Sequence, residues 1–452
     1  MQATKIGGRE QALAFAAIIF LIGLALGGGS SRSDMIQFAL TQVGAVLLLA
    51  VAVLQAPRID QAAMRLPLMF FTFIAVLMMA QLVPLPPSLW QGLPGRELYG
   101  TVADAAGIEQ PWRPISLSPD RTVDSLLSLL PIAAVIACFI AMPRRWSRWM
   151  MVALVVIAAL SSLLAAFQLS EGPSSGLRFY RVTAPDAGVG LLANRNHQAT
   201  LLAMAIPAAV WWGVDGYLRR RSYVPAMVGV ALVALFLAGA ILTGSRSGLA
   251  ACAISVALSL GLTIPLVRRI PLTRLLIAGG IGAVALAALG YFLVADNSGL
   301  SRGLEDEPRF WIWPRVIEAI ETFFPVGSGW GTFDAVFPRF ELVADLTPEY
   351  VNRAHSDFLE VLMDAGVFGA ALIAAFLVWF AISTWRVWRT GREDSAEMLV
   401  ARATSIMILL AIVGSVTDYP VRTAMIGSIL TAACLILNRS AWRPASHHRH
   451  SE

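Results

Sequence analysis

The sequence contains few charged residues. Asp, Glu, Lys and Arg make up 14% of its 452 residues, whereas a soluble domain has roughly 25%. Hydrophobic residues make up 57%, and the mean hydropathy is +0.69. Polar side chains this sparse cannot cover the surface of a folded chain in water. The composition therefore excludes an ordinary soluble protein and predicts one embedded in a lipid bilayer.

Lysine and cysteine are also scarce. Lys5 is the only lysine, and the arginines form short clusters between apolar stretches, which is typical of membrane loops and not of nucleic-acid-binding surfaces. Cys138, Cys252 and Cys434 lie within apolar stretches at spacings that fit no metal site. We interpret them as small core residues.

Motifs for nucleotide and metal chemistry are missing as well. The chain has no P-loop, no dinucleotide-binding fingerprint, no zinc motif, no Ser-His-Asp set and no Asp-x-Asp pair. The histidines near the C-terminus suit a solvated end better than a metal site. The sequence therefore predicts no cofactor and no metal ion.

Apolar stretches of the length that crosses a bilayer, about 20 residues, recur along the whole chain. They lie near residues 11–28, 35–55, 67–84, 124–142, 147–169, 197–214, 224–243, 247–266, 275–294, 358–384, 400–417 and 422–438. The predicted fold class is all-α, a polytopic transmembrane bundle of about twelve helices. The break near Gly244 and the short last pair leave open a re-entrant helix at either place.

The arginines alternate between loops, which predicts the orientation. Arginine-rich short loops mark the cytoplasmic side of a membrane protein, and here every second connection carries them. They are Arg58 and Arg65; Arg144, Arg145 and Arg148; Arg219, Arg220 and Arg221; Arg268, Arg269 and Arg274; Arg386, Arg389 and Arg392. No convincing cleavage site follows the first apolar segment, so it is expected to be a retained helix. Both termini are then cytoplasmic.

Three outer, periplasmic segments are long, at residues 85–123, 170–196 and 295–357. The first is rich in proline, and the third combines tryptophans with a glycine-rich stretch and is expected to contain short helices. Loops of this length are usually functional or disordered. We divide the chain into N-terminal helices (1–170), a core with the largest loop (171–385), and a C-terminal helix pair with a tail (386–452).

His355 is the first candidate for chemistry. It lies where the largest outer loop meets a span, and a histidine can accept a proton near neutral pH. The alternative is an interfacial histidine that caps the following helix. The sequence leaves both open.

Arg246 is the second candidate, within the stretch Thr243-Gly-Ser-Arg-Ser-Gly248 between two apolar runs. An arginine this close to the membrane core usually faces a cavity or binds an anion. The alternative is a simple turn in which the side chain extends to the interface.

Arg309 and Arg315 are further candidates, because guanidinium groups bind phosphate with two hydrogen bonds. The alternative for Arg309 is a salt bridge to Glu305, Asp306 or Glu307.

The stretch Asn194-Arg-Asn-His197 opens a span, and its side chains could bind a sugar or phosphate or could cap the helix. Asn194 and Asn196 are its polar candidates, and Arg181 upstream adds positive charge. Arginines and one histidine thus gather on the outer face, which suits a diphosphate-bearing lipid.

These stretches, taken in their order along the chain, resemble the motifs of a known family. The motifs are Thr243-Gly-Ser-Arg-Ser-Gly248, Arg309-Phe-Trp-Ile-Trp313, Pro325-Val-Gly-Ser-Gly-Trp-Gly331, Ala354-His-Ser-Asp-Phe-Leu359 and the Asn194-x-Asn196 element. Together they resemble the O-antigen ligase and polymerase superfamily over residues 180–370.

The resemblance implies a metal-independent, inverting membrane glycosyltransferase with a GT-C-like fold. Such enzymes lie in the bacterial inner membrane, take a glycan from undecaprenyl diphosphate in the periplasm and transfer it to lipid A-core, to another lipid-linked glycan or to a protein. His355 matches the family's catalytic histidine, Arg246 the arginine of its Ser-Arg motif, and Arg309 the arginine before the tryptophans. Many members have Asn after the histidine, so here Ser356 or Asp357 must substitute.

Other functions remain open at this point. A polymerase would lengthen the repeat on its lipid carrier, whereas a ligase would attach it to lipid A-core. A transporter or flippase for lipid-linked sugars usually shows internal repeats and ionisable residues at the membrane midplane, and we find neither. A membrane scaffold would not need histidine and arginines on one face.

Overall fold

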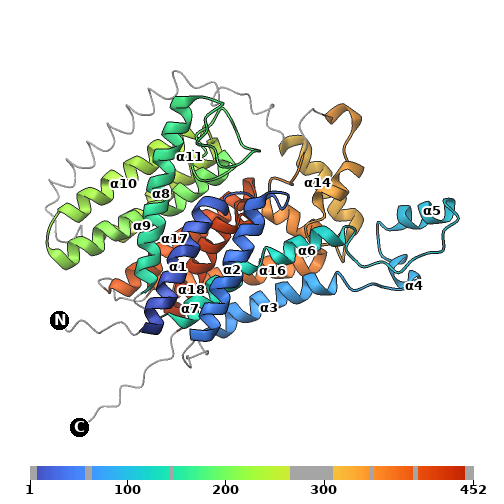
Figure 1. Cartoon of the computed structure of the whole chain (residues 1–452), viewed down its shortest axis with the longest axis horizontal. Helices are drawn as coiled ribbons and strands as arrows, with labels where there is room; N and C mark the ends of the chain where they lie inside the picture. The colour runs from blue at the N-terminus through green and yellow to red at the C-terminus, as the bar shows by residue number, and fades with distance from the viewer. Residues whose placement is uncertain are drawn as a thin grey trace, which may run out of the picture.

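The protein is an all-α polytopic membrane protein. The computed structural model describes residues 8–55, 64–142, 146–264, 309–346, 351–389 and 395–442. In these ranges ten helices are long and apolar enough to cross a membrane. The β-structure in the same ranges is limited to one isolated bridge between Leu85 and Arg113. Figure 1 shows the helices as a bundle from which α4, α5 and α14 project.

The described residues up to Glu171 form eight helices. They are α1 (Gly8–Gly27), α2 (Ile36–Gln55), α3 (Arg65–Ala80), α4 (Pro87–Trp90), α5 (Glu97–Ala105), α6 (Pro119–Leu127), α7 (Leu130–Ala141) and α8 (Trp146–Glu171). The short helices α4 and α5 form the proline-rich outer loop. Helices α6 and α7 together make one span, interrupted at residues 128–129.

The described residues after Glu171 supply the remaining elements. They are α9 (Arg195–Arg220), α10 (Val224–Leu242), α11 (Arg246–Ser259), η2 (Leu260–Thr263), α14 (Arg309–Phe323), α15 (Phe333–Val336), η4 (Phe337–Arg339), η5 (Val343–Asp345), α16 (Asp357–Arg389), α17 (Ala396–Thr417), η6 (Pro420–Arg422) and α18 (Ala424–Ala441). Eleven of the twelve predicted spans coincide with a helix, among them the shorter α3. The span predicted at 275–294 lies outside the described residues, as do Glu305, Asp306 and Glu307. The break near Gly244 separates two helices, and the last pair are two distinct helices.

Burial sorts the spans into central and peripheral helices. In α9 and α17, 78% of the most apolar stretch is buried inside the protein, and the two helices pack against each other. In α2, by contrast, apolar side chains are exposed at helical spacing, at Ile36, Leu40, Val43, Leu47 and Leu54. A continuous apolar stripe of this kind needs a lipid environment. Helices α9 and α17 therefore form the centre, and α2 lies at the periphery.

The connections predicted to be outside meet at one end of the bundle. The Gly29 amide donates a 2.7 Å hydrogen bond to the Tyr180 hydroxyl, and the Ala193 amide donates to the Gly29 carbonyl. The Met425 amide donates to the Gly28 carbonyl, and the Leu117 amide to the Ser328 carbonyl. Segments that alternate along the chain are thus joined on one side, as the arginine pattern predicts.

The largest outer loop is held against α16 by its glycines. Helix α14 packs on α16, and the glycines at 327, 329 and 331 all have positive φ. Gly366, with φ 51° and ψ −127°, breaks α16 into a short first part and a long span. The Pro325 carbonyl fills the space where a Cβ of residue 366 would lie. The kink lets the loop backbone reach the helix.

We expect Gly366→Ala to lower the free energy of unfolding by about 1–3 kcal/mol, because alanine is strained at this backbone conformation and collides with the Pro325 carbonyl. Thermal unfolding of the purified protein in detergent measures the effect. Gly23→Ala is the matched control, since nothing lies within 4 Å of the added Cβ and alanine favours the helix. Equal melting temperatures for the two variants would contradict the role of the kink.

Candidate functional site

The centre of the candidate site is the carboxylate of Asp418, in the short connection between α17 and α18. One oxygen, Oδ1, lies 3.5 Å from Nδ1 of His355 and 3.6 Å from Nε2 of His197. The other, Oδ2, accepts hydrogen bonds from the side-chain amides of Asn196 at 2.5 Å and Asn194 at 3.5 Å. Two histidines and two asparagines from two segments therefore meet on one acid.

The start of α9 supplies three of these side chains. The side chain of Asn194 caps the helix by accepting a hydrogen bond from the Asn196 amide. Capping, the alternative left open for this stretch, is thus confirmed, and the same side chain also donates to Asp418. The positive end of the helix macrodipole stabilises a carboxylate placed there. Helix α9 therefore stabilises the Asp418 carboxylate both by hydrogen bonds and by the positive end of its macrodipole.

His355 comes from the segment that precedes α16. Its φ is +50°, a left-handed conformation that side chains other than glycine rarely adopt and that often marks a functional residue. Ser356 next to it caps α16, because its hydroxyl accepts from the Leu359 amide. The Asp357 amide donates to the Asp418 carbonyl. The capping role considered for His355 therefore belongs to Ser356.

The side chain of His355 is 27% exposed, whereas those of His197 and Asp418 are each 2% exposed. Both histidine rings pack on the Tyr419 ring, with centroids 5.3 Å and 4.9 Å away. His355 can thus meet a ligand at one face while Asp418 holds its other nitrogen. This is the geometry of an oriented general base.

Charges around Asp418 decide its protonation state. Burial raises the pKa of Asp418, but hydrogen bonds and charge from His197 and His355 outweigh burial and hold the pKa well below its usual range. Burial and the Asp418 charge together raise the pKa of Tyr419. Asp418 therefore carries a negative charge beside a neutral phenol.

A second cluster of buried charges lies next to this centre. The Arg422 guanidinium is within 3.5 Å of Asp357, 3.2 Å of Glu360 and 3.3 Å of Asp364. Arg353 forms a 2.7 Å ion pair with Glu360. Glu360 and Asp364 have no exposed side-chain surface. The cluster fixes the first part of α16, and with it the backbone that carries His355.

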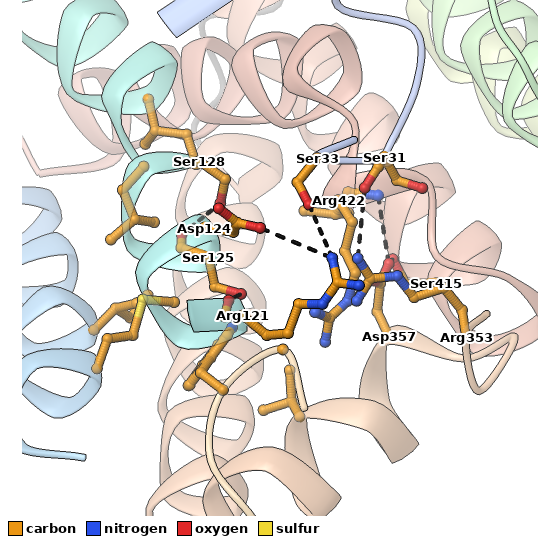
Figure 2. A pocket seen from close by; sticks show the side chains of 18 of the residues that line it. Ser31, Ser33, Arg121, Asp124, Ser125, Ser128, Arg353, Asp357, Ser415 and Arg422 are labelled. Carbon is orange, nitrogen blue, oxygen red and sulfur yellow. Dashed lines mark hydrogen bonds and ion pairs between the residues drawn. The ribbon is translucent and has the colours of Figure 1, made fainter. Parts of the chain in front are cut away.

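A pocket of about 450 Å³ opens beside the cluster. Its wall between the spans is apolar, formed by Phe38, Phe70, Ile74, Met78, Leu129, Ile132, Leu372, Ile373, Phe376, Ala411, Ile412 and Leu430. Its polar part, called the mouth below, contains Arg32, Arg121, Arg353 and Arg422 together with serines and aspartates. Figure 2 shows Arg121, Arg353 and Arg422 directed toward one region of this pocket from three segments. The pocket can accept a molecule with an anionic head and an apolar tail.

Arg246 is placed by the packing of α11 along α9. The Ser255 hydroxyl donates to the Ala203 carbonyl at 2.8 Å, and Cys252 contacts the Ala199 carbonyl, so the two helices run parallel. Arg246, the first residue of α11, therefore lies at the same end as the start of α9. It follows a tight turn at Gly244, as the alternative for this stretch supposed.

Arg309 begins α14, one turn before Trp313 on the same helix face. The Trp313 indole donates a 3.1 Å hydrogen bond to the carbonyl of Ala354, the neighbour of His355. The start of α14 thus lies against the histidine segment. Arg315 forms an ion pair with Glu318 at 3.4 Å along the same helix.

The other predicted binding residues divide between the pocket and the Asp418 centre. Asp357 lines the pocket. Arg181 is exposed and acts electrostatically on Asp34, which lines the pocket mouth. The amides of Asn194 and Asn196 are directed at Asp418. Their predicted contact with substrate stays a prediction, as do the roles of the arginines.

Sequence reasoning missed four residues of this region: Asp418, Arg422, Glu360 and His197 as a side chain of the site. A signal for two of them was present, because Asp418 and Arg422 are an acid and a base within a connection of six residues between apolar helices. That connection is on the side of the predicted outer loops. Charged residues so close to the membrane core are costly and usually functional.

We expect Glu360→Gln to lower the free energy of unfolding by about 3 kcal/mol, because it removes the buried carboxylate that pairs with Arg353 and one of the three carboxylates that share Arg422. Glu318→Gln is the matched control: its side chain is 56% exposed, and its loss should change stability by less than about 0.5 kcal/mol. Thermal unfolding in detergent compares the two. A Glu360→Gln variant as stable as the control would exclude a structural role for the cluster.

Comparison with known proteins finds a family match in the middle of the chain. Residues 230–374 match the family model described as O-Antigen ligase. A search of curated proteins finds no match. The matched range contains Arg246, Arg309 and His355 and ends before Asp418. The resemblance found in the sequence is confirmed over this range, and the match supports the O-antigen ligase and polymerase superfamily.

Proposed function

We propose that this membrane protein is a glycosyltransferase that moves a glycan from an undecaprenyl-diphosphate donor to an acceptor at the periplasmic face of the bacterial inner membrane. The proposed acceptor is lipid A-core, as in O-antigen ligation. The observation that carries this proposal is the pocket with an apolar wall and an arginine-bearing mouth, located next to the histidine segment.

The two parts of the pocket suit the two parts of such a donor. The apolar wall between α2, α3, α16 and α17 suits a polyprenyl chain, since burying apolar surface is favourable. Arg121 and Arg353 at the mouth suit a diphosphate, which guanidinium groups bind with short, charge-assisted hydrogen bonds. Asp357 and Arg181 would contribute to binding the donor at this mouth.

His355 would act as the general base. Its Nδ1 faces Asp418, which leaves Nε2 for the acceptor hydroxyl. The hydroxyl oxygen attacks the anomeric carbon, the bond from that carbon to the diphosphate oxygen breaks, and the hydroxyl proton moves to His355. Attack opposite the leaving group inverts the anomeric centre. Asp418 stabilises the imidazolium that forms, in the manner of acid–histidine pairs elsewhere.

The leaving diphosphate gains negative charge in this step and needs stabilisation. Arg309 and Arg246 are proposed for this role, because preorganised positive groups lower the energy of developing charge without rearranging. Both begin helices whose first turns lie toward the His355 segment. Arg315 would support substrate binding. Asn194 and Asn196 would support it indirectly, because they hold the Asp418 carboxylate. Arginines in this number can serve without a metal ion.

We expect His355→Ala and Arg309→Ala each to reduce glycan transfer by at least about 100-fold, the typical contribution of a general base or a charge-stabilising group. The assay is transfer from undecaprenyl-diphosphate glycan to a defined acceptor by the purified protein. Arg65→Ala is the control, because this exposed arginine begins α3 at the opposite end of the bundle. Wild-type transfer by both site variants, inserted at normal amounts, would refute the proposal.

Deletion of the protein in its host separates the ligase from the polymerase. Loss of a ligase should remove all glycan-capped lipopolysaccharide from a gel, because no repeat reaches lipid A-core. Loss of a polymerase should leave caps of a single repeat. Single-repeat caps would make the protein a polymerase, and an unchanged ladder would exclude both acceptors.

A further inference from the structure

His197 is a buried titratable group that the proposed reaction does not use. It is 1% exposed, so no substrate can reach it. Within the described residues neither ring nitrogen has a hydrogen-bond partner at full hydrogen-bond geometry. Its Nε2 lies 3.6 Å from Asp418 Oδ1, the same oxygen that faces His355. Two histidines therefore share one carboxylate oxygen, one of them exposed to ligands and the other sealed inside.

We propose that His197 is a positioning residue that, through Asp418, sets the pH at which His355 releases its proton. The proposal rests on the proposed function, in which His355 is the base. His197 itself touches neither substrate nor reacting atoms. It acts on the carboxylate that holds the base.

The physical argument is competition for one negative charge. An N–H of His197 directed at Oδ1 stabilises the Asp418 carboxylate and reduces the charge that Asp418 offers to a protonated His355. A protonated His197 would act in the same direction by repelling a second imidazolium. In either state His197 makes His355 lose its proton at lower pH. Removing it should therefore keep His355 protonated to higher pH.

Other groups around His197 leave this sign unchanged. Asp357 of α16 acts electrostatically on His197, and Tyr419 presents its ring edge-on at 4.9 Å. The Asn194 and Asn196 amides bind the opposite oxygen of Asp418. Arg246 lies at the start of α11, which packs along α9, and Arg195 precedes His197 in α9. All of these groups stay in place when His197 alone is replaced.

The test compares His197→Phe with His197→Gln. Phenylalanine keeps a ring against Tyr419 but has no donor, whereas glutamine keeps an N–H for Asp418. We expect the acidic limb of the kcat/KM profile to move up by about 0.5–1 pH unit in His197→Phe, a roughly 3- to 10-fold lower rate on that limb. The rate at high pH and the KM for the lipid donor should stay near wild type. In His197→Gln the limb should lie close to wild type.

A structural role alone would lower the amount of folded protein in both variants without moving the limb. A His197→Phe profile that superimposes on wild type overturns the proposal. If His197→Phe does not fold, His197→Met, a flexible apolar side chain without a donor, takes its place.

A second readout keeps this inference separate from the proposed function. Diethyl pyrocarbonate reacts with neutral imidazole, so the pH dependence of His355 modification, followed by peptide mass spectrometry, reports its protonation without any substrate. We expect the same upward shift in His197→Phe. If the wild-type protein has no transfer activity but His197→Phe still shows this shift, the proposed function is refuted and the coupling is supported. Identical modification curves would refute the coupling whatever the activity.

Discussion

A buried carboxylate must be neutralised by the groups around it, and in this protein that requirement organises one end of the bundle. The side chain of Asp418 is only 2% exposed. Asp418 follows the end of α17 and faces the start of α9, and these two helices are the most buried of the described spans. Donors from α9 and from the segment before α16 converge on it. Since a charge left unpaired at such a place costs several kcal/mol, the positions of these segments are coupled. The candidate base His355 is held by this constraint, in a backbone conformation that an isolated chain would avoid.

The second constraint is the cluster around Arg422. Three acids of the first part of α16 share this guanidinium, and Arg353 joins through Glu360. The Gly366 kink separates this charged part of α16 from its apolar span. The kink therefore lets one helix serve two environments, a polar site wall and the lipid. The same arginines line the mouth of the pocket, so the elements that stabilise the fold also shape the place where an anionic head would bind.

The match of residues 230–374 to the O-antigen ligase family model agrees with this arrangement. The family match covers the residues that supply His355, Arg246 and Arg309. It does not reach the start of α9 or the connection between α17 and α18, which supply His197 and Asp418. Half of the candidate site thus comes from segments outside the matched range, although the geometry joins the two halves on one carboxylate.

The sequence by itself determined the membrane class and the spans and predicted the sidedness, because each depends on local composition. Runs of about 20 apolar residues predict helices, and arginine alternation predicts which connections lie together. It also indicated His355, Arg246 and Arg309, whose types are unusual at the edge of a span. Only the tertiary structure could show that Asn196 and Asp418, 222 residues apart, share a hydrogen bond. The same holds for Arg422 as the partner of three acids of α16. Pairings of this kind depend on how helices pack, which no local pattern encodes.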